Sequence, residues 1–257
     1  MNIDYVFTFI NTSSKGGNLS FTEKALDIGR SNTKVLGAYP INIDNDEYTD
    51  LVLLRLGANQ ILKGGPDCSF TKANKKLAIN GGREWSTGFA AIWEAENALP
   101  TMAIGNYVDR NAPGTPWGTC SPNILLRPDV TNQYAEPLAL EPGYCSLSML
   151  FTDWNKSGLP DLRITNDRQY YRGGEEQLWQ ITPGETPRAY TQNDGWETLQ
   201  IWGMGIAEAD LNGDGFPEYA LTSMGDTKIQ SLDEEGDEES PIYKDIAFES
   251  GATAHRP

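Results

Sequence analysis

The stretch MGIAEADLNGDGFPEYALTSMG, residues 204–225, indicates how this chain folds. A strand-length run of small and apolar residues leads into a polar loop, and a second run begins with an acid and continues apolar. Three other segments follow the same plan and indicate an internal repeat. They are residues 39–57 (YPINIDNDEYTDLVLLRLG), 89–107 (FAAIWEAENALPTMAIGNY) and 147–167 (LSMLFTDWNKSGLPDLRITND).

The spacing of this repeat favours a β-propeller. The four loops begin at Asn42, Trp93, Asp153 and Asp210, which gives steps of 51, 60 and 57 residues. Propeller blades are usually about 40–50 residues long, so these steps leave room for long outer loops. Stretches of helical period are nearly absent. We therefore expect an all-β fold, a propeller of four-stranded antiparallel blades. Residues 1–257 would form a single propeller domain or fragment, with repeats centred near 42–56, 93–107, 153–167 and 210–224.

Two strands are expected in each repeat, one on either side of the loop. The expected strands are Val35–Ile41, Leu51–Leu56, Phe89–Trp93, Thr101–Tyr107, Cys145–Phe151, Asp161–Thr165, Gly205–Ala209 and Tyr219–Ser223. Residues 113–142 are expected to form an irregular excursion between blades.

The loop of the fourth repeat has the ligand pattern of a hard cation. Ca²⁺ takes six to eight oxygen ligands, and alternate residues of a tightly curled loop point their oxygens at one centre. Gly215 at position 6 permits the sharp turn that such a loop needs. The alternative is an acidic turn held by Asx hydrogen bonds. The predicted ligands are Asp210, Asn212, Asp214, the Phe216 carbonyl and Glu218.

Two further loops keep this pattern with one substitution each. In the third repeat Ser157 stands at position 5, where a neutral oxygen predicts weaker binding. In the first repeat Glu47 replaces the glycine at position 6, and a non-glycine residue resists the positive φ expected there. The predicted ligands are Asp153, Asn155, Ser157, the Leu159 carbonyl and Asp161 in the third loop, and Asn42, Asp44, Asp46, the Tyr48 carbonyl and Asp50 in the first.

The second loop has lost the oxygens at positions 1 and 3, which are Trp93 and Ala95. We expect it to be free of metal and kept for packing. An EF-hand would need a bidentate Glu at position 12 and flanking helices. In the other three loops position 12 falls inside an apolar run, on Leu53, Ile164 and Leu221, which excludes that motif.

The composition argues against several other kinds of site. The chain has 20 Lys and Arg against 36 Asp and Glu, a formal charge of −16, whereas a nucleic-acid partner needs a basic surface. The single histidine, His255, argues against zinc sites and catalytic triads that use histidine. The three cysteines leave room for one disulfide and one free thiol. Cys120–Cys145 is the expected pair, because a disulfide there would stabilise the intervening loop most.

Neither a membrane span nor a signal peptide is expected in this chain. The apolar runs fall short of the roughly 18 residues that a membrane helix needs. Residues 1–10 include Asp4 and lack the basic region of a signal peptide.

The loops resemble the calcium loops of FG-GAP and VCBS repeats, found in the propellers of integrin α-subunits. From about Asp27 onward the chain is similar to bacterial relatives of cartilage acidic protein, the ASPIC/UnbV-associated family. The segments on which this resemblance depends are residues 202–218, 162–168 with 173–179, 50–52 with 59–62, 103–109 and 123–127.

The resemblance implies a secreted, periplasmic or cell-surface propeller of seven or eight blades with Ca²⁺ on its rim. It implies adhesion to an extracellular protein or glycan as the role, and it places the metal ligands at the loop positions given above. Only four blades are visible in the sequence. We therefore expect a fragment of a longer protein; the alternatives are closure as a small propeller and self-association with a second copy through open blade edges.

Besides this non-catalytic module, two other functions stay open. One is a polysaccharide lyase or hydrolase, because aromatic rings stack on sugars and arginine pairs with uronate carboxylates. The same cluster could instead be an ordered loop between strands. The other is a structural surface-layer or filament subunit, which an open propeller edge would suit. The residues of the candidate sugar site are Arg168, Tyr170, Tyr171 and Arg172.

Overall fold

The computed structural model describes residues 6–26, 28–29, 33–94, 97–113, 119–134, 136–167, 174–233 and 240–252. Within these ranges nearly all regular structure is β-strand, which confirms the all-β prediction. Short 3-10 turns occur at η2 (Pro66–Cys68) and η3 (Gln192–Asp194). No helix in the described ranges has the length and apolar character that crossing a membrane requires.

Four antiparallel sheets of four strands each make up the body of the molecule. The first contains β3 (Val35–Ile41), β4 (Asp50–Arg55), β5 (Gln60–Gly65) and β6 (Ser69–Lys72), and the second contains β7 (Ser86–Ile92), β8 (Thr101–Asn106), β11 (Asn123–Leu126) and β12 (Leu138–Leu140). The third contains β13 (Ser146–Thr152), β14 (Asp161–Asn166), β15 (Gln177–Gln180) and β16 (Arg188–Ala189), and the fourth contains β17 (Gly203–Ala209), β18 (Glu218–Ser223), β19 (Lys228–Leu232) and β20 (Tyr243–Asp245).

The strands predicted beside the loops are present, with ends that differ by at most three residues from the prediction. The expectation for residues 113–142 was wrong, because β11 and β12 lie in that stretch and complete the second sheet. Both strands are short, and prolines flank β11 on either side, so the stretch has the composition of a loop.

The four sheets share one backbone plan. In each, a loop of eight residues joins the first strand to the second, and the residue before the loop pairs with the residue after it. The register also shifts by one residue near the start of each first strand. The pairs that close the loops are Ile41↔Asp50, Ile92↔Thr101, Thr152↔Asp161 and Ala209↔Glu218.

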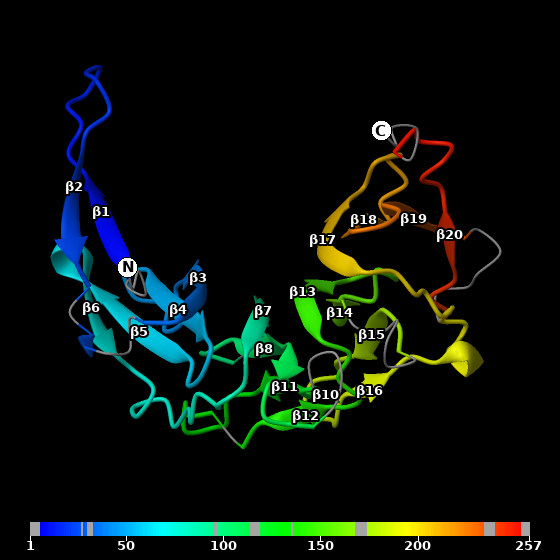
Figure 1. Cartoon of the computed structure of the whole chain (residues 1–257), viewed down its shortest axis with the longest axis horizontal. Coiled ribbons are helices and arrows are strands. Elements are labelled where there is room, and N and C mark those ends of the chain that lie inside the picture. Colours follow the sequence, from blue (N-terminus) through cyan, green and yellow to red (C-terminus); the bar gives the residue numbers. More distant parts are fainter. Residues whose placement is uncertain are drawn as a thin grey trace.

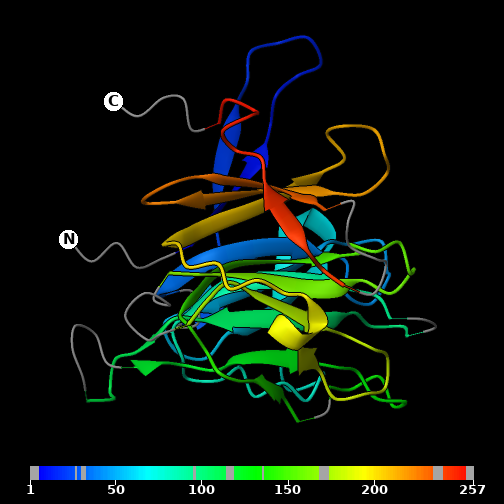
Figure 2. The same cartoon turned by 90° about the vertical axis from the view of Figure 1, so that its right-hand side faces the viewer.

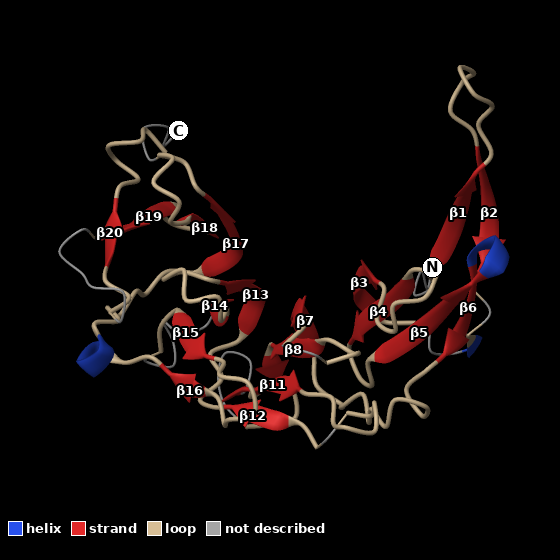
Figure 3. Cartoon of the chain, turned by 180° about the vertical axis from the view of Figure 1, so that it is seen from behind, coloured by secondary structure: helices blue, strands red, loops and turns tan. Residues whose placement is uncertain are grey.

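The sheets follow one another along an open arc (Figure 1), which Figure 3 shows from behind. The first strand of each sheet lies on the concave side, where β3 contacts β7, β7 contacts β13, and β13 contacts β17. Buried apolar side chains fill the space between neighbouring sheets. Because a sheet inside the arc is covered on both faces, β8 and β14 are buried along their whole length.

Two hairpins are added to this body. Strands β1 (Phe7–Asn11) and β2 (Phe21–Ala25) form a hairpin that projects beyond the sheets (Figure 2). Residues Leu26 and Ile28 follow it and cover the outer face of the first sheet. Strands β9 (Val108–Asp109) and β10 (Thr119–Cys120) form the second hairpin. The expected cysteine pair is joined in the structure, and the Cys120–Cys145 disulfide ties this hairpin to the start of the third sheet.

Candidate metal centres

An acid at position 9 anchors the first and fourth loops to the sheet. The Asp50 carboxylate accepts the Ile43 backbone N–H at 2.9 Å, and the Glu218 carboxylate accepts the Leu211 backbone N–H at 2.6 Å. Ile43 and Leu211 both stand at position 2 of their loops. Both acids are about 2% exposed. A buried carboxylate that accepts backbone N–H groups fixes the shape of the loop as well as offering oxygens to a cation.

Asp161, the acid of the third loop, has the same place and different partners. One oxygen accepts the Trp154 indole N–H at 2.8 Å and the Tyr190 hydroxyl at 2.9 Å. The other oxygen accepts the Ile181 backbone N–H at 3.0 Å. Burial raises the pKa of the Asp161 carboxyl against the effect of these hydrogen bonds. Trp154 at position 2 therefore replaces the backbone donor used in the other loops.

The fourth loop is curled around its first residue. Asp210 accepts the Gly213 N–H at 2.7 Å with one oxygen and the Gly215 N–H at 2.9 Å with the other. Both glycines have positive φ, 81° and 85°, which a residue without Cβ adopts at no steric cost. The glycines at positions 4 and 6 thus let one aspartate hold the whole turn.

Side-chain oxygens at positions 3 and 5 of this loop each accept the backbone N–H two residues further on, as in Asx turns. Asn212 Oδ1 accepts the Asp214 N–H at 2.8 Å, and Asp214 Oδ1 accepts the Phe216 N–H at 2.7 Å. The Asn212 amide nitrogen lies 2.9 Å from Asp214 Oδ2 and 3.0 Å from Glu218 Oε1. The Phe216 N–H and the Asn212 amide lower the pKa of the Asp214 carboxyl. The amide therefore donates where two carboxylates converge, a position that a cation would compete for.

The third loop repeats the curl of the fourth. Asp153 Oδ2 accepts the Gly158 N–H at 2.9 Å, the same contact between positions 1 and 6. Lys156 and Gly158, at positions 4 and 6, have positive φ of 56° and 77°. The Ser157 hydroxyl donates to Asp153 Oδ1 at 3.2 Å, and the Ser157 N–H donates to Asn155 Oδ1 at 3.2 Å. Loops 153–161 and 210–218 are therefore built alike.

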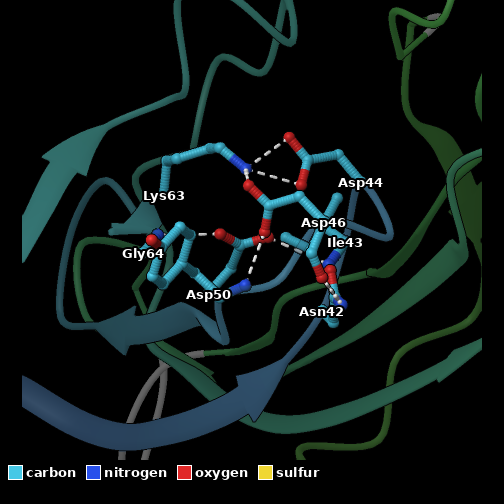
Figure 4. A network of polar contacts seen from close by, with 8 residues as sticks. Asn42, Ile43, Asp44, Asp46, Asp50, Lys63 and Gly64 are labelled. Carbon is cyan, nitrogen blue, oxygen red and sulfur yellow. Dashed lines mark hydrogen bonds and ion pairs between the residues drawn. The ribbon is translucent and has the colours of Figure 1, made fainter. Parts of the chain in front are cut away.

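The first loop differs, because a lysine from the third strand of its sheet enters it (Figure 4). Lys63 Nζ lies 2.6 Å from Asp44 and 2.5 Å from Asp46, the acids at positions 3 and 5. Burial acts to lower the pKa of the ammonium, but the hydrogen bonds with both acids outweigh it and raise that pKa above its ordinary value. Positive φ occurs at Asn45 and not at Glu47, so the turn expected at position 6 is missing.

The second loop also has a basic partner. Arg127 Nε donates to Glu94 Oε1 at 2.9 Å, and both side chains are largely buried. Arg127 also donates to the Thr182 carbonyl of the next sheet at 2.8 Å. At position 9 the Thr101 hydroxyl is buried without a hydrogen-bond partner in the described chain. This loop is held to its sheet by an ion pair that we did not predict from the sequence.

Not all predicted residues meet at one place. Among the residues that the structure describes, no three His, Cys, Asp or Glu side chains form a group with metal-holding geometry. The predicted donors of loops 153–161 and 210–218 are not all carboxylates, because they also include amide, hydroxyl and carbonyl oxygens. The predicted sugar site, Arg168 with Tyr170, Tyr171 and Arg172, lies outside the described residues. Sequence reasoning missed Lys63 and Arg127, because their contact with the loops depends on strand register.

Comparisons with models of known protein families and with curated protein sequences returned no match to this chain. What the loops bind therefore has to be inferred from their own geometry.

Proposed function

We propose that this chain is a non-catalytic, calcium-binding β-propeller module that contacts extracellular proteins or glycans, with one Ca²⁺ in loop 153–161 and one in loop 210–218. A single observation is the main support. Asp153 and Asp210 each close their loop onto the N–H of position 6 at 2.9 Å, so two loops of the same chain turn the same oxygens inward. Ca²⁺ prefers such oxygen donors in an adaptable geometry.

The arrangement of the sheets supports a propeller. Each sheet has four antiparallel strands, and its first strand contacts the first strand of the next sheet on the concave side of the arc. In a propeller the first strands of the blades surround a central axis in this way. A β-sandwich would place two sheets face to face around one core, whereas here a separate core lies between each sheet and the next along the arc.

The charge of the chain supports a role for cations. At a formal charge of −16 the folded chain repels itself, and bound divalent ions would reduce that repulsion. Ca²⁺ that binds only the folded state would stabilise it by about 2.7 kcal/mol per site at one hundred times Kd. The ions would then hold the loops rigid at the end of the sheets where a partner could bind.

Calorimetric calcium titration of the apo chain, with melting curves in calcium and in EGTA, tests this function. We expect a higher Tm in calcium, and we expect Asp153→Asn and Asp210→Asn each to remove one ion. Asp129→Asn is the matched control, because Asp129 holds an exposed turn by similar hydrogen bonds outside these loops. Equal Tm values in calcium and EGTA would refute the proposal.

A further inference from the structure

One position on the third strand of each sheet faces the acid end of the loop. The register pairs Leu51 with Leu62, and equivalent pairs occur in the other three sheets. The residue that follows this pair on the third strand therefore lies opposite position 9. In the second sheet it stands directly after the end of that strand. The residues at this position are Lys63, Arg127, Gln180 and Ser231 in sheets one to four.

The charge at this position differs between the loops that keep the calcium pattern and the loops that depart from it. Lys63 and Arg127 are cations, and they accompany the two loops that depart from the calcium pattern. Gln180 and Ser231 are neutral, and they accompany the two loops that keep the pattern. Ser231 Oγ donates to Glu218 Oε1 at 3.0 Å, so this position does reach the loop acid.

Lys63 contacts its loop as a bound cation would. Its ammonium contacts the two acids at alternate positions, Asp44 and Asp46, and its side chain is about one quarter exposed. A tethered ammonium competes with a free ion at high effective concentration, because the chain holds it beside the acids. A divalent ion in this loop would have to displace it from both acids.

Loops 153–161 and 210–218 have no lysine or arginine at the equivalent third-strand position. No lysine or arginine of the described chain hydrogen-bonds a carboxylate of either loop. Lys156, at position 4 of the third loop, lies beside the fourth loop, where it donates to the main-chain carbonyl of Asp214 at 2.9 Å and lies over the Phe216 ring. Their carboxylates are therefore hydrogen-bonded by neutral donors, and not by a lysine or arginine of the described chain.

We propose that Lys63 is the cation of the first loop in place of a metal ion, and that the residue at its third-strand position decides whether a loop of this chain takes a divalent cation. This inference rests on the proposed function for the loops that begin at Asp153 and Asp210. It reduces the number of calcium ions expected from the sequence by one, because the Asn42–Asp50 loop is neutralised from within the chain.

The first test compares two variants that both have glycine at position 6 of the first loop and differ only in the presence of Lys63. Glu47→Gly supplies the glycine that the motif lacks, and it is made alone and together with Lys63→Gln, which copies Gln180. Calorimetric calcium titration then counts the ions per chain. We expect no extra ion with Glu47→Gly alone and one extra ion with both changes. An extra ion with Glu47→Gly alone, or none with both changes, would overturn the inference.

The second test places a cation at the equivalent position of the third sheet. Gln180→Lys is expected to lose one calcium ion per chain, while the neutral Gln180→Met loses none; circular dichroism checks that both fold. Equal ion counts for these two variants would overturn the inference.

A failure of the proposed function has a different signature. A wild-type chain that binds no calcium would refute that function, but the comparison of Glu47→Gly with and without Lys63 would still decide this inference.

Discussion

The guanidinium of Arg163 lies over the ring of Tyr219, 4.0 Å from its centroid, where the third sheet meets the fourth. Trp196 and Tyr243 add two more rings around the same cation, at 5.3 Å and 4.8 Å. Arg163 also donates to the Gln230 side chain, and the residue is 1% exposed. A buried arginine therefore joins two sheets through aromatic faces, an attraction that strengthens when water is excluded.

Truncating this arginine should loosen the contact between the sheets. We expect Arg163→Ala to lower the free energy of unfolding by roughly 2–4 kcal/mol, since it removes the cation–π contacts and leaves a cavity. Urea denaturation measures this. Arg188→Ala is the control: Arg188 lies 5.1 Å from the Tyr190 centroid but its side chain is half exposed, so the loss should stay within about 1 kcal/mol. Equal losses in the two variants would contradict the role of burial.

Glu176 should make stability fall as pH rises. Burial raises the pKa of its carboxyl from 4.5 to about 8, so between these values the folded state holds a proton that the unfolded state has released. The resulting stabilisation is complete below pH 4.5 and is lost as pH rises through about 8. Urea denaturation across this range measures the slope.

Glu176→Gln separates this effect from other pH-dependent terms. Glutamine can still accept the Asn166 N–H, which the native carboxyl accepts at 3.0 Å. We expect the variant to lack this part of the pH dependence and to be more stable than wild type at high pH. Parallel stability profiles for the two proteins would show that the carboxyl keeps an ordinary pKa.

The local parts of this structure could be predicted from the sequence, and the parts set by register could not. Loop 210–218 and its flanking strands lie in one continuous stretch, so spacing alone locates them. The outer strands are less visible, because β16 has only two residues and β12 follows a Pro-rich segment. Such strands form because the backbone N–H and C=O groups of a neighbouring strand pair with them, and the residue types of the short strand do not reveal this pairing.

The candidate sites show the same division. The oxygens of Asp210 and its loop follow directly from alternate positions in sequence. Lys63, by contrast, is 19 residues from Asp44 and meets it only because β4 and β5 pair in one register. A one-residue slip of that pairing would point the lysine to the other face of the sheet. No local signal could have identified it.

Gly158 and Gly184 offer a matched test of loop geometry. Both have φ of 77° and open space where a Cβ would lie, but only Gly158 belongs to a candidate calcium loop. Either glycine replaced by alanine should lose about 1 kcal/mol of unfolding free energy in EGTA, from backbone strain alone. Only Gly158→Ala should also weaken calcium binding, as measured by calorimetry. The same calcium affinity in both variants would mean that the curl of the loop does not shape the site.

Trp154 should report directly on an ion in the third loop. Its indole N–H binds the Asp161 carboxylate at 2.8 Å, so its ring lies beside the proposed centre. Terbium replaces calcium in oxygen sites and emits when a nearby tryptophan transfers its excitation energy. We expect terbium emission on tryptophan excitation in wild type, and we expect excess calcium to reduce it to background. In Trp154→Phe this emission should be lost. Trp93→Phe is the control, because Trp93 occupies position 1 of the second loop, where the ligand pattern is broken. Emission that survives Trp154→Phe and disappears with Trp93→Phe would place the ion in the wrong loop and contradict the assignment.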